Sequence, residues 1–321
     1  MMSVMKTANL ALGCMGMSGT YGPATDDESI KTIHEAIERG ITLLDTGDFY
    51  GMGHNEMLIG RAIAGRRDKV RISVKFGALR GPDNSWLGVD CRPAAVSNFA
   101  AYSLKRLGVD VIDVYRPARL DPNVPIEDTV GAIAKLIEKG YVRHVGLSEV
   151  GVDTIRRAHK VSPVHDLQIE YSLASRNPED KIFPVLEELG IGATLYGILS
   201  RGLLSGSKPA ATPGDFRANL PRFSGEEGAR NAALVERLAA FASKTGRTPA
   251  QLSVAWVLAK QPRLTPLLGP RTREQLIDLL RALDKPLTSQ ELADVEAIVP
   301  KGAIEGGRYI AAQLAHLDSE K

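Results

Sequence analysis

The sequence has little of what marks secreted, membrane-spanning or metal-binding proteins. Of its 321 residues only two are cysteines, Cys14 and Cys91. They have neither the spacing of a metal site nor that of a redox pair, so we expect no metal and a cytoplasmic protein. The one apolar stretch near the N-terminus, Leu10 to Gly16, is short and interrupted by glycine. We therefore expect neither a signal peptide nor a membrane span there.

An excess of charge of either sign is also absent. The net charge is +2 at pH 7, and there is no dense basic run. Nothing in this balance favours binding to nucleic acid or to a membrane. Apolar residues make up 44% of the chain and charged residues 24%, which is ordinary for a globular protein. The length allows one large α/β domain or two smaller ones.

One unit of helix, glycine and apolar strand recurs along the chain. Gly40, Gly108, Gly140 and Gly190 each stand between a helical pattern and a following apolar run. Glycine at this point supplies the left-handed turn that ends a helix. Strands that are continuous apolar runs and alternate with helices indicate a parallel sheet that is covered on both faces.

Counting these units predicts the fold class. Strands are expected at residues 10–13, 42–45, 70–75, 111–115, 142–148, 166–170, 192–196 and 264–268. Helices are expected at residues 26–39, 55–64, 93–107, 126–139, 153–160, 180–189, 229–261 in two pieces, 272–282 and 288–299. Eight βα units are typical of a (β/α)8 TIM barrel. No strand is followed by the glycine-rich turn of a doubly wound dinucleotide-binding fold. We therefore predict one barrel domain over residues 1–321.

A carboxylate, a phenol and a lysine come at the ends of two neighbouring predicted strands. Asp45 ends one apolar run, Lys75 ends the next, and Tyr50 lies in the glycine-containing loop after Asp45. The active sites of such barrels lie at the carboxyl ends of the strands, so these side chains are expected to meet. Lys75 would lower the pKa of the phenol and Asp45 would keep Lys75 charged, which makes Tyr50 a proton donor to a carbonyl oxygen. Each residue alone also has an ordinary structural role, and only their joint occurrence favours chemistry.

One connection in the predicted barrel is unusually long. Residues 197–228 are rich in glycine, proline, serine and arginine. A connection of this length in a compact domain is usually a lid or a binding loop, and a surface insertion is the alternative.

Several motifs occur in the order typical of one known family. They are Leu12 to Ser18, Asp45 to Gly51, Ser73 to Lys75, Val145 to Glu149, Gln168 to Ser172, and Arg201 to Gly206. With these motifs the chain resembles the aldo-keto reductases over nearly its whole length. It is similar to the branch of bacterial and plant enzymes acting on aldehydes and ketones, with pyridoxal reductase-like members nearby. The resemblance implies a (β/α)8 barrel that reduces a small carbonyl substrate with hydride from NADPH.

The resemblance also implies where NADPH lies. The implied cofactor contacts are Ser148, Gln168, Tyr196, Leu199, Ser200, Arg201, Gly269, Arg271, Arg273 and Gln275. Ser148 and Gln168 would hold the nicotinamide carboxamide and Tyr196 would stack on its ring. Arg271 and Arg273 flank a helix N-terminus, where a phosphate is stabilised, and so favour NADPH over NADH. Gln275 has a second interpretation, because with Thr272 it is spaced as a helix capping box.

Two departures from the family concern the predicted site. Ala118 stands where a histidine is usual, so the second hydrogen-bond donor to the carbonyl oxygen is missing. Arg116, Arg119 or His54 could replace it. Leu279 stands where an adenine-binding asparagine is common. The missing histidine leaves an alternative open, which is a nucleotide-binding sensor or subunit with weak turnover.

A third departure and the substrate pocket complete the expectations. The segment before Leu10 is short, so the hairpin that closes the bottom of the barrel in the family would be reduced. Candidates for the pocket walls are Tyr21, Trp86, Arg116, Ala118, the 197–228 loop, and the tail around Arg308 and Tyr309. An arginine in such a pocket would suit a phosphate or carboxylate on the substrate.

Overall fold

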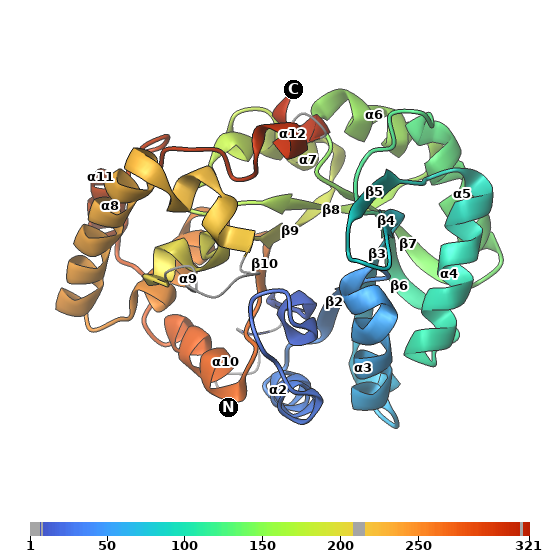
Figure 1. Ribbon diagram of the computed structural model, residues 1–321, viewed down its shortest axis with the longest axis horizontal. Helices are drawn as coiled ribbons and strands as arrows, with labels where there is room; N and C mark the ends of the chain where they lie inside the picture. Colours follow the sequence, from blue (N-terminus) through green and yellow to red (C-terminus); the bar gives the residue numbers. More distant parts are fainter. Residues whose placement is uncertain (1–6, 8, 208–215, 315–316) are drawn as a thin grey trace.

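Parallel strands enclosed by helices make up the protein, as the computed structural model in Figure 1 shows. It describes residue 7 and residues 9–207, 216–314 and 317–321. The strands of the barrel are β1 (Ala11–Gly13), β2 (Leu43–Gly47), β3 (Arg71–Phe76), β6 (Ile112–Pro117), β7 (Val142–Ser148), β8 (Val164–Glu170), β9 (Gly192–Tyr196) and β10 (Thr265–Leu268). They close in the order β1–β10–β9–β8–β7–β6–β3–β2, all parallel. The predicted single-domain (β/α)8 barrel is therefore confirmed.

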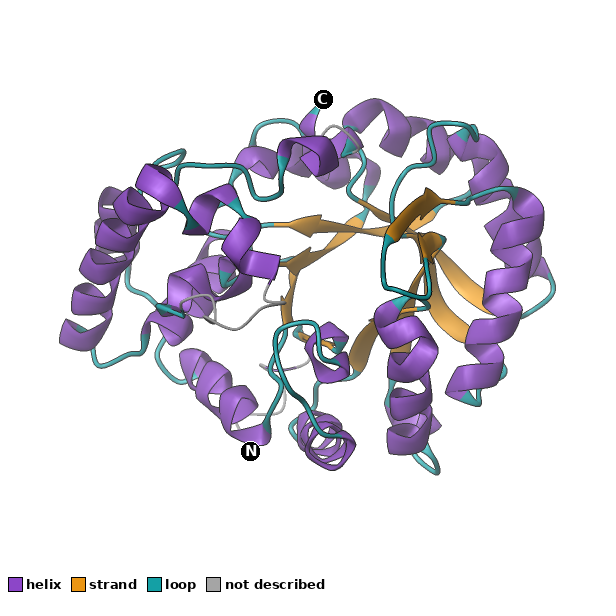
Figure 2. Ribbon diagram, viewed as in Figure 1, coloured by secondary structure: helices purple, strands orange, loops and turns teal. Residues whose placement is uncertain are grey.

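The helices lie around the outside of this barrel (Figure 2). They are α2 (Asp26–Glu38), α3 (His54–Ile63), α4 (Pro93–Leu107), α5 (Ile126–Glu138), α6 (Val152–Val161), α7 (Ile182–Leu189), α8 (Gly225–Lys244), α9 (Pro249–Lys260), α10 (Arg273–Leu280), α11 (Ser289–Ile298) and α12 (Ala311–Leu314). Helix α11 packs beside α8 and α9 at one side of the barrel (Figure 1). No helix in the described part of the chain is long and apolar enough to cross a membrane.

Apolar spacing and glycine explain why the elements form where they do. In α5 the buried side chains Ile126, Val130 and Ile133 recur at helical spacing and face the barrel. All four predicted helix-ending glycines have positive φ angles, between +65° and +85°. A residue with a Cβ is disfavoured there, so glycine directs the chain from helix to strand.

The helix N-termini show where local sequence is decisive and where it is not. Thr288 and Glu291 form a full capping box at α11. At α2 the Thr25 side chain accepts from the Glu28 amide, but the Glu28 carboxylate turns instead to Arg273 on α10. A long-range ion pair thus replaces the second half of a capping box at α2.

Two segments have structure that the sequence did not predict. A two-stranded hairpin, β4 (Ala78–Arg80) with β5 (Trp86–Val89), follows β3. The long connection after β9 starts with a 3-10 helix, Ser200–Ser205, and α8 begins at its end. Residues 208–215 of this predicted lid, and most of the segment before Leu10, lie outside the described residues.

The C-terminal tail crosses the barrel end from α11 to α6 (Figure 1). There the Asp318 carboxylate accepts hydrogen bonds from the Gly151 amide and the Thr154 hydroxyl, at 2.8 and 2.7 Å. These contacts fix the tail over the strands that end at Ser148 and Glu170.

Candidate active site

The structure brings Asp45, Tyr50 and Lys75 together at the carboxyl end of the barrel. Strands β2 and β3 are neighbours, and Gly47 pairs with Lys75 across them. The buried Lys75 ammonium donates a hydrogen bond to the Asp45 carboxylate. The same ammonium lies 5.1 Å from the centre of the Tyr50 ring. The three groups can therefore act on one another, as the sequence predicted.

The sequence predicted that the pKa of the Tyr50 phenol is lowered, and this prediction is wrong. Burial raises the pKa of the Tyr50 phenol well above its ordinary value, and the Asp45 carboxylate raises it further. The Arg119 guanidinium acts in the opposite direction. Burial also lowers the pKa of Lys75, against which Asp45 favours the charged form. Local sequence showed the neighbouring charges but not the loss of solvent, which dominates here. The phenol thus keeps the proton that a general acid needs.

Asp45 is held by more than Lys75. Its second oxygen accepts hydrogen bonds from the Ser73 hydroxyl and the Gln168 side-chain amide, each at 2.8 Å. Gln168 therefore reaches across the barrel from β8 to the carboxylate on β2. The role of Ser73 as a support of Asp45 was not predicted, although alternation along β3 places it on the same face as Lys75.

The ends of β7, β8 and β9 offer polar groups beside this cluster. Ser148 is 1% exposed, and its hydroxyl has no hydrogen-bond partner in the described part of the chain. It pairs in register with Gln168 on β8. A buried hydroxyl without a partner is costly, so the position suits a ligand amide. This observation fits a nicotinamide carboxamide at Ser148. Tyr196, at the end of β9, donates a hydrogen bond of 2.7 Å to Glu149.

The backbone after β9 is in an unusual conformation. Ser200 and Arg201 both have positive φ angles, +46° and +56°. The Ser200 amide donates to the Gly197 carbonyl at 2.7 Å, which fixes the turn. Non-glycine residues in this region store strain and cluster at functional sites. The segment coincides with the predicted cofactor contacts Leu199, Ser200 and Arg201.

The predicted adenosine-phosphate segment lies at the start of α10. The Thr272 hydroxyl accepts from the Gln275 amide at 3.2 Å, and the Gln275 side chain accepts from the Arg271 amide at 2.8 Å. Gln275 is therefore a turn-stabilising residue in this structure. Arg271 donates to the Tyr21 carbonyl at 2.8 Å, and the half-exposed Arg273 pairs with Glu28. Both guanidinium groups lie at a helix N-terminus, where the backbone favours anions.

The profile of the Aldo/keto reductase family matches residues 9–300. The chain belongs to the aldo/keto reductase family. A probable aldo-keto reductase 1 from Glycine max is 40% identical over 311 residues, which are 95% of this chain and 89% of the plant protein. The resemblance inferred from the motifs is thus confirmed, and membership makes the protein an oxidoreductase.

Solved structures of the family resemble this one over almost the whole chain. Glycerol dehydrogenase AKR11B4 from Gluconobacter oxydans is 29% identical with a TM-score of 0.83, and 93% of each chain is covered. An aldo/keto reductase from Klebsiella pneumoniae, solved in complex with NADP and acetate, is 25% identical with a TM-score of 0.72, and 94% of each chain is covered.

Two of the three predicted substitutes for the missing histidine are engaged elsewhere in this aldo/keto reductase. Arg116 is 0% exposed and pairs with Asp166 at 2.7 Å inside the barrel, where it also donates to Ser73. The sequence had suggested Arg116 as a wall of the substrate pocket, and this prediction is wrong because Arg116 lies inside the barrel. His54 contacts Ser18 and, at 3.0 Å, Asp26 on α2.

Arg119 remains beside the reaction site. Ala118 is 2% exposed and offers only a methyl group. The Arg119 guanidinium donates to the Ala118 carbonyl at 2.6 Å and to the Tyr309 hydroxyl at 3.2 Å. The Ala118 amide donates to the Phe76 carbonyl at 2.8 Å, so Arg119 follows the end of β6 beside β3, and its charge lowers the pKa of Tyr50. Tyr21, a predicted pocket residue, raises the pKa of the same phenol. Trp86, another predicted pocket residue, is exposed on β5 and lies beside Arg80.

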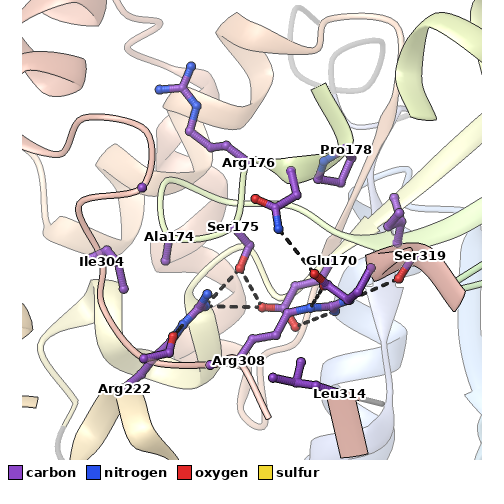
Figure 3. A pocket seen from close by; sticks show the side chains of 16 residues that line it. Glu170, Ala174, Ser175, Arg176, Pro178, Arg222, Ile304, Arg308, Leu314 and Ser319 are labelled. Atoms are coloured by element: carbon purple, nitrogen blue, oxygen red, sulfur yellow. Dashed lines mark hydrogen bonds and ion pairs between the residues drawn. The ribbon is translucent and has the colours of Figure 1, made fainter. Parts of the chain in front are cut away.

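A buried ionic cluster next to the site was not predicted. Arg308 from the C-terminal tail donates to both carboxylate oxygens of Glu149 and lies 3.3 Å from Glu170. Arg222 lies 3.6 Å from Glu170, and Ser175 bridges the two (Figure 3). Although burial opposes it, Arg308 holds the pKa of Glu149 at about 2. The signal in the sequence was two glutamates at the ends of buried strands, since buried carboxylates need cations.

A cavity of about 240 Å³ is lined in part by residues of this cluster (Figure 3). Its walls include Arg176, Arg222 and Arg308, together with Ile304 and Leu314. Neither Tyr50 nor Lys75 lines it. The cavity is therefore separate from the reaction site, and its arginines are paired with glutamates.

Proposed function

We propose that this protein reduces an aldehyde or ketone to the alcohol, taking hydride from NADPH and a proton from Tyr50. The observation that carries the proposal is the buried cluster of Asp45, Lys75 and a protonated Tyr50 phenol at the carboxyl end of the barrel. A general acid must hold its proton until the reaction, and burial ensures this for Tyr50.

Ser148, Gln168 and Tyr196 are the residues we assign to the nicotinamide, and Arg271 with Arg273 to the 2′-phosphate of NADPH. The unpartnered Ser148 hydroxyl supports the first assignment. The complex of the Klebsiella pneumoniae relative with NADP supports the choice of cofactor. NADPH would supply the hydride when bound, and the side chains of the protein would bind the substrate and supply the proton.

In this proposal Tyr50 donates its proton to the carbonyl oxygen as negative charge develops there. The Lys75 ammonium, 5.1 Å from the ring centre, then stabilises the phenolate that remains. Asp45 keeps Lys75 in place, and Ser73 and Gln168 keep Asp45 in place. A positioned general acid contributes roughly 10²- to 10⁴-fold in rate.

Consumption of NADPH by the purified protein with a panel of aldehydes and ketones tests the proposal. We expect turnover with NADPH and much less with NADH, because the two arginines match a 2′-phosphate. NADPH binding without turnover on any carbonyl compound would instead support the nucleotide-binding sensor, which the absence of a histidine at Ala118 favours.

A further inference from the structure

Arg119 differs from the other arginines around the barrel mouth, because it is only partly buried and contacts no carboxylate among the residues that the structure describes. Arg308 pairs with Glu149, Arg201 and Arg222 with Glu170, and Arg116 with Asp166. Arg119 is at ion-pair distance from no carboxylate in the described part of the chain. Its two hydrogen bonds go to neutral oxygens, those of Ala118 and Tyr309. Because the guanidinium is partly exposed and contacts no carboxylate of the described residues, it can pair with an anion that enters from solution.

The location of Arg119 points to the substrate. It follows β6, and β6 lies beside β3, where Arg116 pairs in register with Lys75. The assigned nicotinamide contacts lie instead at the ends of β7, β8 and β9. The charge of Arg119 acts directly on the pKa of the Tyr50 phenol. The Ala118 amide also donates to the Phe76 carbonyl at 2.8 Å, so Arg119 follows the strand end beside Lys75, and we expect an anion held there to lie near Tyr50.

Two hydrogen bonds hold the Arg119 guanidinium in place and leave its other N–H donors available for a ligand. A guanidinium has five N–H donors, of which Arg119 uses one for the Ala118 carbonyl and one for the Tyr309 hydroxyl. The Tyr309 ring is itself held against Arg201, whose guanidinium carbon lies 4.3 Å from the ring centre. Ala118 adds only a methyl group at the strand end. The remaining donors can form the two parallel hydrogen bonds that a carboxylate or phosphate accepts.

We propose that Arg119 is the specificity-determining residue for substrates that carry an oxyanion group, a carboxylate or a phosphate, beside the carbonyl that is reduced. Tyr309 is the positioning residue that orients it. The inference rests on the proposed function, since it assigns the substrate class of the same site. Arg119, which follows Ala118, would thus bind the substrate and would not replace the missing histidine as a donor to the carbonyl oxygen.

Matched substrate pairs test the inference. We compare kcat/KM for 4-formylbenzoate with that for its methyl ester, and for glyceraldehyde 3-phosphate with that for glyceraldehyde. Wild type should prefer the charged member of at least one pair, and that pair identifies carboxylate or phosphate. Arg119→Gln should reduce this preference by about 10- to 100-fold, the usual effect of losing hydrogen bonds to a charged group. Arg119→Lys keeps the positive charge but cannot form two parallel hydrogen bonds, so it should retain only part of the preference for the charged substrate.

Two further variants separate a specific role from a general one. Tyr309→Phe removes the hydroxyl that Arg119 contacts and should reduce the same preference while the ring remains. Arg92→Gln alters an exposed arginine that pairs with Asp90 and should leave the preference unchanged. The inference would be overturned if wild type and Arg119→Gln had the same preference for the charged substrate while circular dichroism showed that both proteins were folded.

A binding measurement keeps the inference testable if the proposed function fails. Calorimetric titration with 4-(hydroxymethyl)benzoate and with inorganic phosphate needs no turnover. Weaker binding to Arg119→Gln than to wild type supports the anion site even in a protein that reduces nothing. Active enzyme that binds neither anion through Arg119 refutes the inference and leaves the proposed function intact.

Discussion

Replacement of Arg308 by methionine should destabilise the protein by about 3 kcal/mol near neutral pH. Arg308 is the cation in contact with Glu149, whereas Glu170 also has Arg201 and Arg222 within 3.6 Å. The variant would therefore remove the cation that contacts the buried Glu149 carboxylate, leaving the more distant charge of Arg119 to act on it. Its pKa of about 2, against an ordinary 4.5, corresponds to about 3 kcal/mol, since one pKa unit is worth about 1.4 kcal/mol. The known cost of breaking a buried ion pair, about 3–5 kcal/mol, agrees.

The dependence on pH distinguishes this mechanism from simple loss of packing. In wild type the contribution of Glu149 is complete above its unfolded pKa and is lost as the pH falls from about 4.5 to about 2. Without Arg308, we expect burial to outweigh the remaining effects of Arg119 and the Ser319 hydroxyl and to raise the pKa of Glu149 above its ordinary value. The variant should then regain stability relative to wild type as the pH falls from about 7 to about 5, because Glu149 takes up a proton.

Urea unfolding of both proteins at several pH values measures these differences. Arg230→Met is the matched control, because Arg230 pairs with Glu226 and Glu305 but its side chain is 50% exposed. An exposed pair of this kind contributes at most about 1 kcal/mol. If Arg308→Met costs no more than the control, or if its deficit does not shrink on acidification, the reasoning is refuted.

Three further predictions follow from single sites. Arg271→Ala should weaken NADPH binding by about 1–3 kcal/mol and leave NADH binding little changed in a fluorescence titration; equal losses would indicate that Arg271 serves only its bond to Tyr21. Burial raises the pKa of Asp48 to about 7, so wild type should lose stability as the pH rises from about 4 to about 7. Asp48→Asn should remove that slope in urea unfolding at several pH values, and an unchanged slope would contradict the assignment. Ala118→His should lower turnover in steady-state kinetics, because the buried imidazole must displace its neighbours beside Arg119; a gain would mean that a donor is missing.

Much of the barrel could be predicted because its signals are local. Continuous apolar runs marked the strands, and glycines such as Gly40 and Gly190 marked the turns that feed them. The β4–β5 hairpin was missed because it is short and solvent-facing, with Trp86 and Leu87 exposed. Such strands have no apolar periodicity to recognise.

The spatial cluster of Asp45, Tyr50 and Lys75 was predicted from the sequence, but its electrostatics were not. The sequence identified Asp45, Tyr50 and Lys75 through the strand ends that carry them. It did not show that Tyr50 is fully desolvated, and so gave the wrong direction for its pKa. It also offered Arg116 as a pocket residue, because its partner Asp166 on β8 becomes visible only when the barrel closes. Pairing between distant strands is a property of the fold and not of any local pattern.

Turnover and cofactor binding by Tyr50→Phe test the central claim most directly. The substitution removes the proton donor and leaves the ring that packs against Phe49. We expect kcat for carbonyl reduction to fall by about 10²-fold or more, while the Kd for NADPH, measured by fluorescence titration, stays within about twofold of wild type. A variant that keeps more than about a tenth of wild-type kcat would show that Tyr50 is not the general acid.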